Sequence, residues 1–126
     1  MFANYRVMYL RDKSSQPVGC VAINLHRYDG GKPYAEYQFS VVNPEDRSTQ
    51  EPFDRAFSRH LALGRVLENP FIVHLPHTEV DMHEVSKAVM TDLVKYHAAP
   101  SRARKAAALW LKRAKAKAEA RMLRGD

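Results

Sequence analysis

The first 42 residues alternate between apolar and polar side chains, a pattern typical of β-strands that bury one face. The alternation is clearest in the segments 5–10, 21–26 and 35–42. A polar stretch at 12–17 separates the first two segments, and Asp29 begins a turn with two glycines before the third. Turns of this length join antiparallel neighbours. The sequence therefore predicts a three-stranded antiparallel meander, with Phe39 in its core.

After a loop at 43–51 the apolar positions recur with helical spacing. Pro52 suits the first turn of a helix, and Asn69 and Pro70 end it. Seven residues fall on one helical face and are predicted to be its buried side: Phe53, Ala56, Phe57, His60, Leu61, Gly64 and Leu67. The short apolar run 71–75 can add a fourth strand.

Two more helices are predicted beyond this run. Asp81 can cap the first, with Glu84 three residues later, and Ser101 after Pro100 can cap the second. The apolar stripe of the first of these helices comprises Met82, Val85, Val89, Leu93 and Tyr96. The element order β-β-β-α-β-α-α predicts an α+β fold, with an antiparallel sheet of three or four strands and helices on one face.

Positive charge is concentrated at the end of the chain. Residues 99–126 hold nine Lys or Arg against two acidic residues, a net of +7, whereas the whole chain is +6. The first 98 residues are therefore close to neutral. We predict a near-neutral α+β body at 1–98, able to fold by itself, followed by a basic C-terminal helix at 99–126.

The basic helix combines a narrow stripe of mostly small residues with a cationic side. The stripe, which predicts only light docking on the body, comprises Ala103, Ala107, Leu111, Ala114, Ala118 and Met122. Trp110 interrupts the polar remainder, and Arg55 and Arg59 in the first helix offer a second, weaker cationic element. The candidate binding residues are Arg102, Lys105, Trp110, Arg113, Lys117, Arg121, Arg124, Arg55 and Arg59.

Candidate chemistry for catalysis is sparse. His74, His77 and His83 lie near acidic residues, but their spacing matches neither a structural zinc site nor a metalloprotease helix. The sequence has no G-x-S-x-G elbow, P-loop or dinucleotide-binding glycine pattern. Cys20 is the single cysteine and is expected to be buried in a strand. We predict a protein that is not an enzyme, with no metal and no cofactor.

One stretch resembles the GNAT acetyltransferases. It includes Pro17, Val18 and Gly19, the strand 35–42 and the run 42–47, which look like the central strands of that family leading to its cofactor loop. The family holds the pyrophosphate of acetyl-CoA with a glycine-rich loop at a helix N-terminus. Here the corresponding run, 48–54, has no glycine and contains two carboxylates. The resemblance implies a shared meander, and an acetyltransferase is the third alternative for function.

A second resemblance covers about half the chain. The run 41–47, then Phe53, Asp54 and Arg55, then 61–65, is similar to small bacteriophage accessory proteins of uncharacterised function. It carries over no catalytic residues. The resemblance implies a phage-encoded protein that binds nucleic acid or occupies a host enzyme or defence complex.

Two functional hypotheses follow from these features. The first is a non-enzymatic accessory protein that binds nucleic acid, with weak sequence specificity, by contacting phosphates through the basic helix. The alternative is an inhibitor resembling anti-CRISPR proteins, whose basic helix enters an acidic groove of a host protein. No segment approaches the roughly 20 apolar residues of a membrane span. The expected location is the cytoplasm, that of the host cell for a phage protein, without membrane contact.

Overall fold

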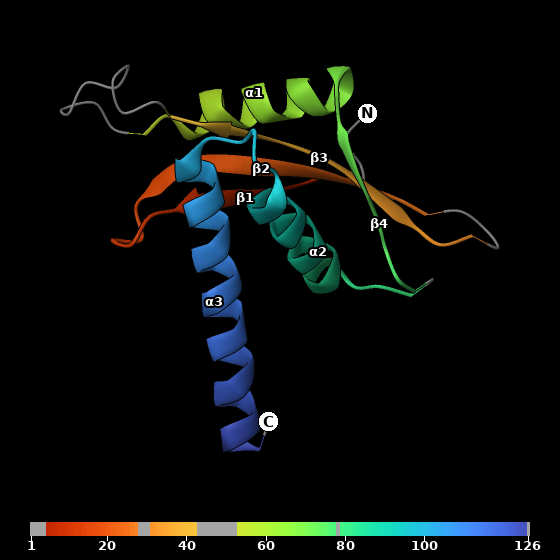
Figure 1. Cartoon of the computed structure of the whole chain (residues 1–126), viewed down its shortest axis with the longest axis vertical. Helices are drawn as coiled ribbons and strands as arrows, with labels where there is room; N and C mark the ends of the chain where they lie inside the picture. The colour runs from red at the N-terminus through yellow and green to blue at the C-terminus, as the bar shows by residue number, and fades with distance from the viewer. Residues whose placement is uncertain (1–4, 28–30, 43–52, 78, 126) are drawn as a thin grey trace.

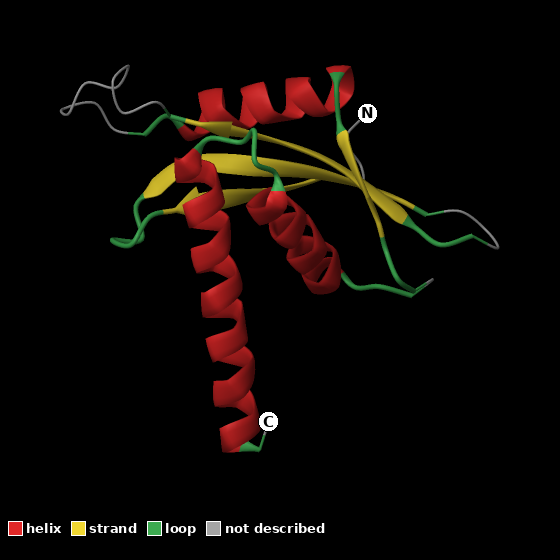
Figure 2. Cartoon of the chain, in the orientation of Figure 1, coloured by secondary structure: helices red, strands yellow, loops and turns green. Residues whose placement is uncertain are grey.

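The computed structural model describes residues 5–27, 31–42, 53–77 and 79–125, which form a four-stranded antiparallel sheet and three helices (Figures 1 and 2). The strands lie in the order β1-β2-β3-β4, so β1 and β4 are the edges of the sheet. This arrangement confirms the predicted α+β fold and element order. The elements are β1 (Tyr5–Arg11), β2 (Pro17–His26), β3 (Tyr34–Val41), α1 (Arg55–Glu68), β4 (Phe71–His74), α2 (Met82–Lys95) and α3 (Ser101–Arg124).

The main core lies between the sheet and the helices α2 and α3. Val21, Ile23 and Leu25 of β2 point to this side, as the alternation predicted. Tyr37 of β3 is fully buried there, and its hydroxyl donates a hydrogen bond of 2.6 Å to the Asp92 carboxylate of α2. Burial and this hydrogen bond raise the pKa of the Tyr37 hydroxyl, so the side chain is neutral near neutral pH.

Helices cover both faces of the sheet, and not one face as predicted. α1 lies on one side, whereas α2 and α3 lie on the other (Figure 1). Successive strand residues point to opposite faces, so Cys20 and Ala22 of β2 meet Ala62 and Val66 of α1. The sequence analysis missed this second buried face because Cys20 and Ala22 are small and alternate with the larger apolar residues of β2, so their pattern did not indicate burial.

The buried side of α1 also differs from the prediction. Ser58, Ala62 and Val66 face the sheet, whereas Phe57 is 60% exposed and Leu67 is exposed to the same extent. The choice of Phe57 as a core residue was therefore wrong, while Phe39 is buried as predicted. Smaller side chains let a helix lie closer to a sheet. The side of α1 with Ser58, Ala62 and Val66 therefore faces the sheet, and the side with the larger Phe57 and Leu67 faces outward.

The contact between α1 and the sheet is close and partly polar. Cys20 is buried, as predicted, and accepts a hydrogen bond of 3.3 Å from the Ser58 hydroxyl. The hydroxyls of Ser40 and Ser58 lie 2.7 Å apart. On neighbouring strands the backbone is also tightly packed, because a Cβ atom at Gly19 would lie 2.1 Å from the Ser40 carbonyl oxygen.

Of the three helix starts, only that of α2 follows its sequence signal. α1 begins at Arg55, later than Pro52 predicted, with Asp54 as its cap. The Asp81 carboxylate accepts a hydrogen bond of 2.8 Å from the Glu84 backbone amide, which confirms the predicted cap of α2. Ser101 is not a cap. It is the first residue of α3, and Pro100 occupies the cap position without a side-chain hydrogen bond. Among the described residues, no helix is both long enough and apolar enough to cross a membrane.

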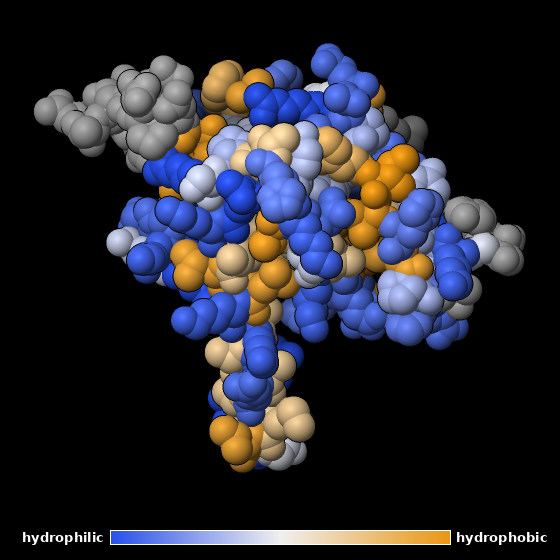
Figure 3. Space-filling model, viewed as in Figure 1, coloured by the Kyte–Doolittle hydropathy of each residue, from blue (hydrophilic) through white to orange (hydrophobic). Residues whose placement is uncertain are grey.

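α3 has a buried first half and an exposed second half. Ala103, Ala106 and Ala107 belong to the main core, and Trp110 and Leu111 pack against it. Farther along the same helix Met122 is 79% exposed, and the C-terminal half stands clear of the body (Figure 3). The boundary between 98 and 99 stays a prediction, but the first half of α3 shares its core with the body.

Candidate functional site

A groove runs along the edge strand β1, between this strand and α3. Its volume is about 670 Å³. One wall is β1 from Arg6 to Tyr9 together with Arg11, and the other is the exposed half of α3 from Trp110 to Arg121. Ala114 and Ala118 line the second wall, so no bulky side chain of α3 fills the space at these two positions. The groove exists because α3 leaves the body at the sheet edge.

The described residues that line the groove make it strongly cationic. Five of them carry a guanidinium or ammonium group and none is acidic. The two from β1 and the three from α3 are Arg6, Arg11, Arg113, Lys117 and Arg121. Cations on facing walls, without carboxylates to neutralise them, concentrate positive potential in the space between.

Two contacts hold the walls in place. Arg113 of α3 donates a hydrogen bond of 3.1 Å to the Asp12 carbonyl oxygen in the β1–β2 turn. His83, from the first turn of α2, lines the groove, and its ring centroid lies 6.0 Å from that of Trp110. Trp110 packs against the core on one side and borders the groove on the other, so the groove combines cations with an aromatic surface.

The structure separates the predicted binding residues into groups. Trp110, Arg113, Lys117 and Arg121 come together in the groove. Arg102 does not join them, because it donates a hydrogen bond of 2.6 Å to the Val42 carbonyl oxygen just after β3. Lys105 and Arg124 are exposed on α3 and are not among the lining residues of the groove.

Arg55 and Arg59 lie on the α1 side of the sheet. The Arg55 guanidinium lies 5.1 Å from the ring centroid of Tyr9, at the distance of a cation–π contact. Arg59 borders a second, smaller hollow of about 440 Å³, which it shares with Leu63 and three residues of β1. Those three are Tyr5, Val7 and Tyr9. Burial raises the pKa of the Tyr5 hydroxyl, and the Glu36 carboxylate raises it further.

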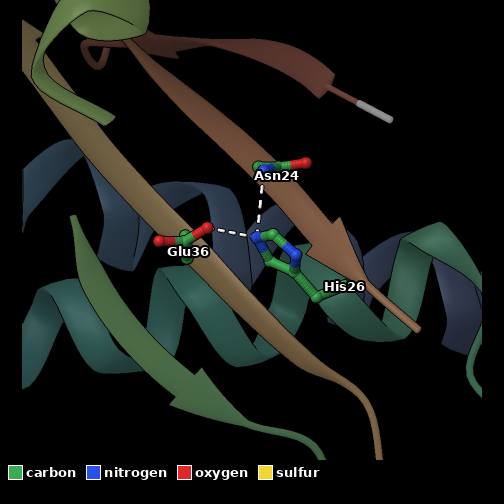
Figure 4. A network of polar contacts seen from close by, with 3 residues as sticks. All are labelled: Asn24, His26 and Glu36. Carbon is green, nitrogen blue, oxygen red and sulfur yellow. Dashed lines mark hydrogen bonds and ion pairs between the residues drawn. The ribbon is translucent and has the colours of Figure 1, made fainter. Parts of the chain in front are cut away.

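A polar network lies on the same face of the sheet, near the hollow, because Asn24 of β2 pairs with Tyr5 of β1 (Figure 4). The His26 Nε2 contacts Glu36 Oε1 on β3 and lies 3.0 Å from the Asn24 Nδ2. Tyr34 stacks on the His26 ring with centroids 4.6 Å apart, and its ring in turn lies near His74. These contacts link the strands β2, β3 and β4 on this face of the sheet.

The histidines near residue 80 do not gather into a site. His74 contacts Tyr34 on the α1 side of the sheet, whereas His83 lines the groove beside Trp110. Within the described parts of the chain, no group of three or more His, Cys, Asp or Glu side chains is placed to hold a metal ion. The run compared with the GNAT cofactor loop, 48–54, lies outside the described residues except for Phe53 and Asp54.

Sequence reasoning missed two cations and a histidine among the residues that line the groove. Arg6 and Arg11 are the cations of its β1 wall, and His83 contributes from α2. The predicted meander makes the first strand an edge of the sheet, but no signal in the sequence shows that the last helix lies beside it. Arg6 and Arg11 become part of a cationic groove only because α3 lies beside β1.

Comparisons with known proteins add no family to this picture. No protein-family model matches the sequence, and neither curated proteins nor solved structures gave a match. The functional argument therefore depends on the groove itself.

Proposed function

We propose that the protein binds nucleic acid through the groove between β1 and α3. The observation that carries this proposal is the set of five cations on facing walls, with no acidic residue among the described lining. Phosphates repeat along a nucleic acid at intervals that a row of Lys and Arg can follow. The proposal involves no catalytic step, and phage origin and a cytoplasmic location remain predictions.

The chemistry of the groove favours contacts with the backbone over recognition of bases. Lys and Arg bind phosphates irrespective of sequence, and Trp110 offers a ring face on which a base of any kind can stack. A helix placed beside an edge strand matches none of the motifs that read the major groove. We therefore expect weak sequence specificity.

A pair of matched double variants tests this proposal. Lys117→Gln with Arg121→Gln removes two charges from the groove, whereas Lys112→Gln with Lys115→Gln removes two charges from exposed positions of the same helix. Both variants have the same net charge. Fluorescence anisotropy with a labelled 16-nucleotide strand should show a large loss of affinity for the first variant and a small one for the second.

Equal losses in the two variants would mean that only net charge matters, and would refute the groove as the site. Absence of binding by the wild-type protein at low salt would refute nucleic acid as the ligand. That result would favour the inhibitor hypothesis, because an acidic protein surface is the other ligand that suits a cationic groove.

A further inference from the structure

The two hollows on either side of β1 are adjacent parts of one surface. Val7 and Tyr9 line both of them. β1 is an edge strand, so in the sheet order no further strand lies beyond it to separate the hollows. A ligand that occupies the cationic groove can therefore continue around the edge of the sheet to the α1 side.

The two hollows differ in chemistry. The groove on the α3 side contains five Lys or Arg side chains, whereas the hollow on the α1 side offers two tyrosine rings, Leu63 and a single cation, Arg59. Cations suit phosphates, and flat rings with a nearby guanidinium suit unstacked bases. The Arg55 guanidinium lies over the Tyr9 ring, although Arg55 does not line this hollow.

We infer that the ligand is a single strand of nucleic acid that passes around β1, with phosphates in the groove and bases against Tyr5 and Tyr9. This inference rests on the proposed function and specifies its substrate. A duplex has a persistence length of about 150 base pairs and cannot bend sharply at low cost. It cannot follow a path around one strand, since neighbouring strands lie only about 4.8 Å apart. A flexible single strand can.

The test measures how a substitution in the second hollow changes the affinity for nucleic-acid strands of different lengths. Arg59→Gln changes an exposed residue of α1, so the fold should be preserved. The control is Lys95→Gln, an exposed cation at the end of α2 that lines neither hollow. Labelled oligo-dT and oligo-rU of 4, 8, 12 and 16 nucleotides and a 16-base-pair duplex are titrated with each protein at about 50 mM salt.

A strand of four nucleotides should occupy only the groove, and its affinity should be unchanged by Arg59→Gln. Affinity for the 12- and 16-nucleotide strands should fall about twofold to fivefold, the effect of losing one exposed contact between a guanidinium and a base. Lys95→Gln should leave the affinity for both the short and the long strands unchanged. The two homopolymers show whether DNA, RNA or both are accepted.

Several results would overturn the inference while leaving the groove proposal intact. One is an equal effect of Arg59→Gln on short and long strands, and another is no effect at any length. Duplex binding as tight as that of the 16-nucleotide strand would also contradict a path around β1. Displacement of the long strand by an equally charged poly-glutamate peptide at the same concentration would contradict the groove proposal as well, because it would make an acidic protein the better ligand.

Discussion

The Arg113 guanidinium donates a hydrogen bond to the Asp12 carbonyl oxygen, a contact that joins α3 to the turn after β1 across 101 positions of sequence. Before Arg113 in the chain, α3 is part of the core. After Arg113, the helix projects from the body (Figure 3). Arg113 therefore marks the point at which one helix changes from a structural element to a wall of the groove.

Two truncations separate these roles. A chain that ends at Lys112 keeps the buried Ala103, Ala106 and Ala107 and should melt cooperatively, within about 1 to 2 kcal/mol of the full chain. A chain that ends at Pro100 loses those contacts and uncovers part of the main core. We expect it to show no cooperative melt. Thermal unfolding followed by circular dichroism checks both, and a cooperative melt of the shorter chain would show that the body is independent.

Gly19 and Gly64 provide a contrast between a crowded and an open position. Gly19→Ala should destabilise the protein by at least about 3 kcal/mol, because its Cβ would collide with the Ser40 carbonyl oxygen. Gly64→Ala should stabilise it by about 0.5 to 1 kcal/mol, because this helical position has no neighbour within 4 Å of an added Cβ. Urea unfolding measures both. Similar effects of the two substitutions would contradict the close approach of β2 and β3 at Gly19.

Two phenylalanines test which side of α1 is buried. Phe39 is buried, and Phe39→Ala should cost about 3 to 5 kcal/mol of unfolding free energy. Phe57 is mostly exposed, and Phe57→Ala should cost less than about 1 kcal/mol. The comparison uses the same residue type in both places. A large loss of stability at Phe57 would mean that this side chain is covered in solution.

Tyr37 makes a pH-dependent contribution to stability. At neutral pH, Tyr37→Phe should lower the free energy of unfolding by about 1.5 to 3 kcal/mol, because it removes the hydrogen bond to the Asp92 carboxylate. In the unfolded chain this tyrosine ionises near its ordinary pKa of 10.0, whereas in the folded chain its pKa is raised. The contribution is thus complete below about pH 10 and declines at higher pH.

Chemical denaturation at pH 7 and above pH 10 measures this effect. The difference in stability between wild type and Tyr37→Phe should shrink as the pH rises past 10, since only the wild type loses this contribution. A difference that stays constant would show that Tyr37 ionises as readily in the folded protein as in the unfolded chain, and one that grows would show that it ionises more readily when folded.

The sequence predicted those parts of the fold that depend on local pattern. Alternation located the three long strands, and the cap at Asp81 located the start of α2. The large apolar side chains of α1 were misleading, because burial there depends on the small residues Cys20, Ala22 and Ser40 of distant strands. Periodicity within one helix carries no information about the surface on which it packs.

The candidate site was predictable only on one of its walls. Charge along α3 pointed to Arg113, Lys117 and Arg121, and the structure places all three in the groove. The opposite wall depends on β1 being an edge strand that lies beside α3, which is a property of the tertiary arrangement. Arg6 and Arg11 belong to an ordinary amphipathic strand until that arrangement is known.

The dependence of affinity on salt tests the central claim most directly. Each lost phosphate contact on a single strand should lower the slope of log affinity against log salt by about 0.7. For the 16-nucleotide strand, Lys117→Gln with Arg121→Gln should therefore reduce the slope by about 1.4 relative to wild type. The matched variant Lys112→Gln with Lys115→Gln should leave it nearly unchanged. If both pairs reduced the slope equally, or neither did, the groove between β1 and α3 would not be the surface that holds the phosphates.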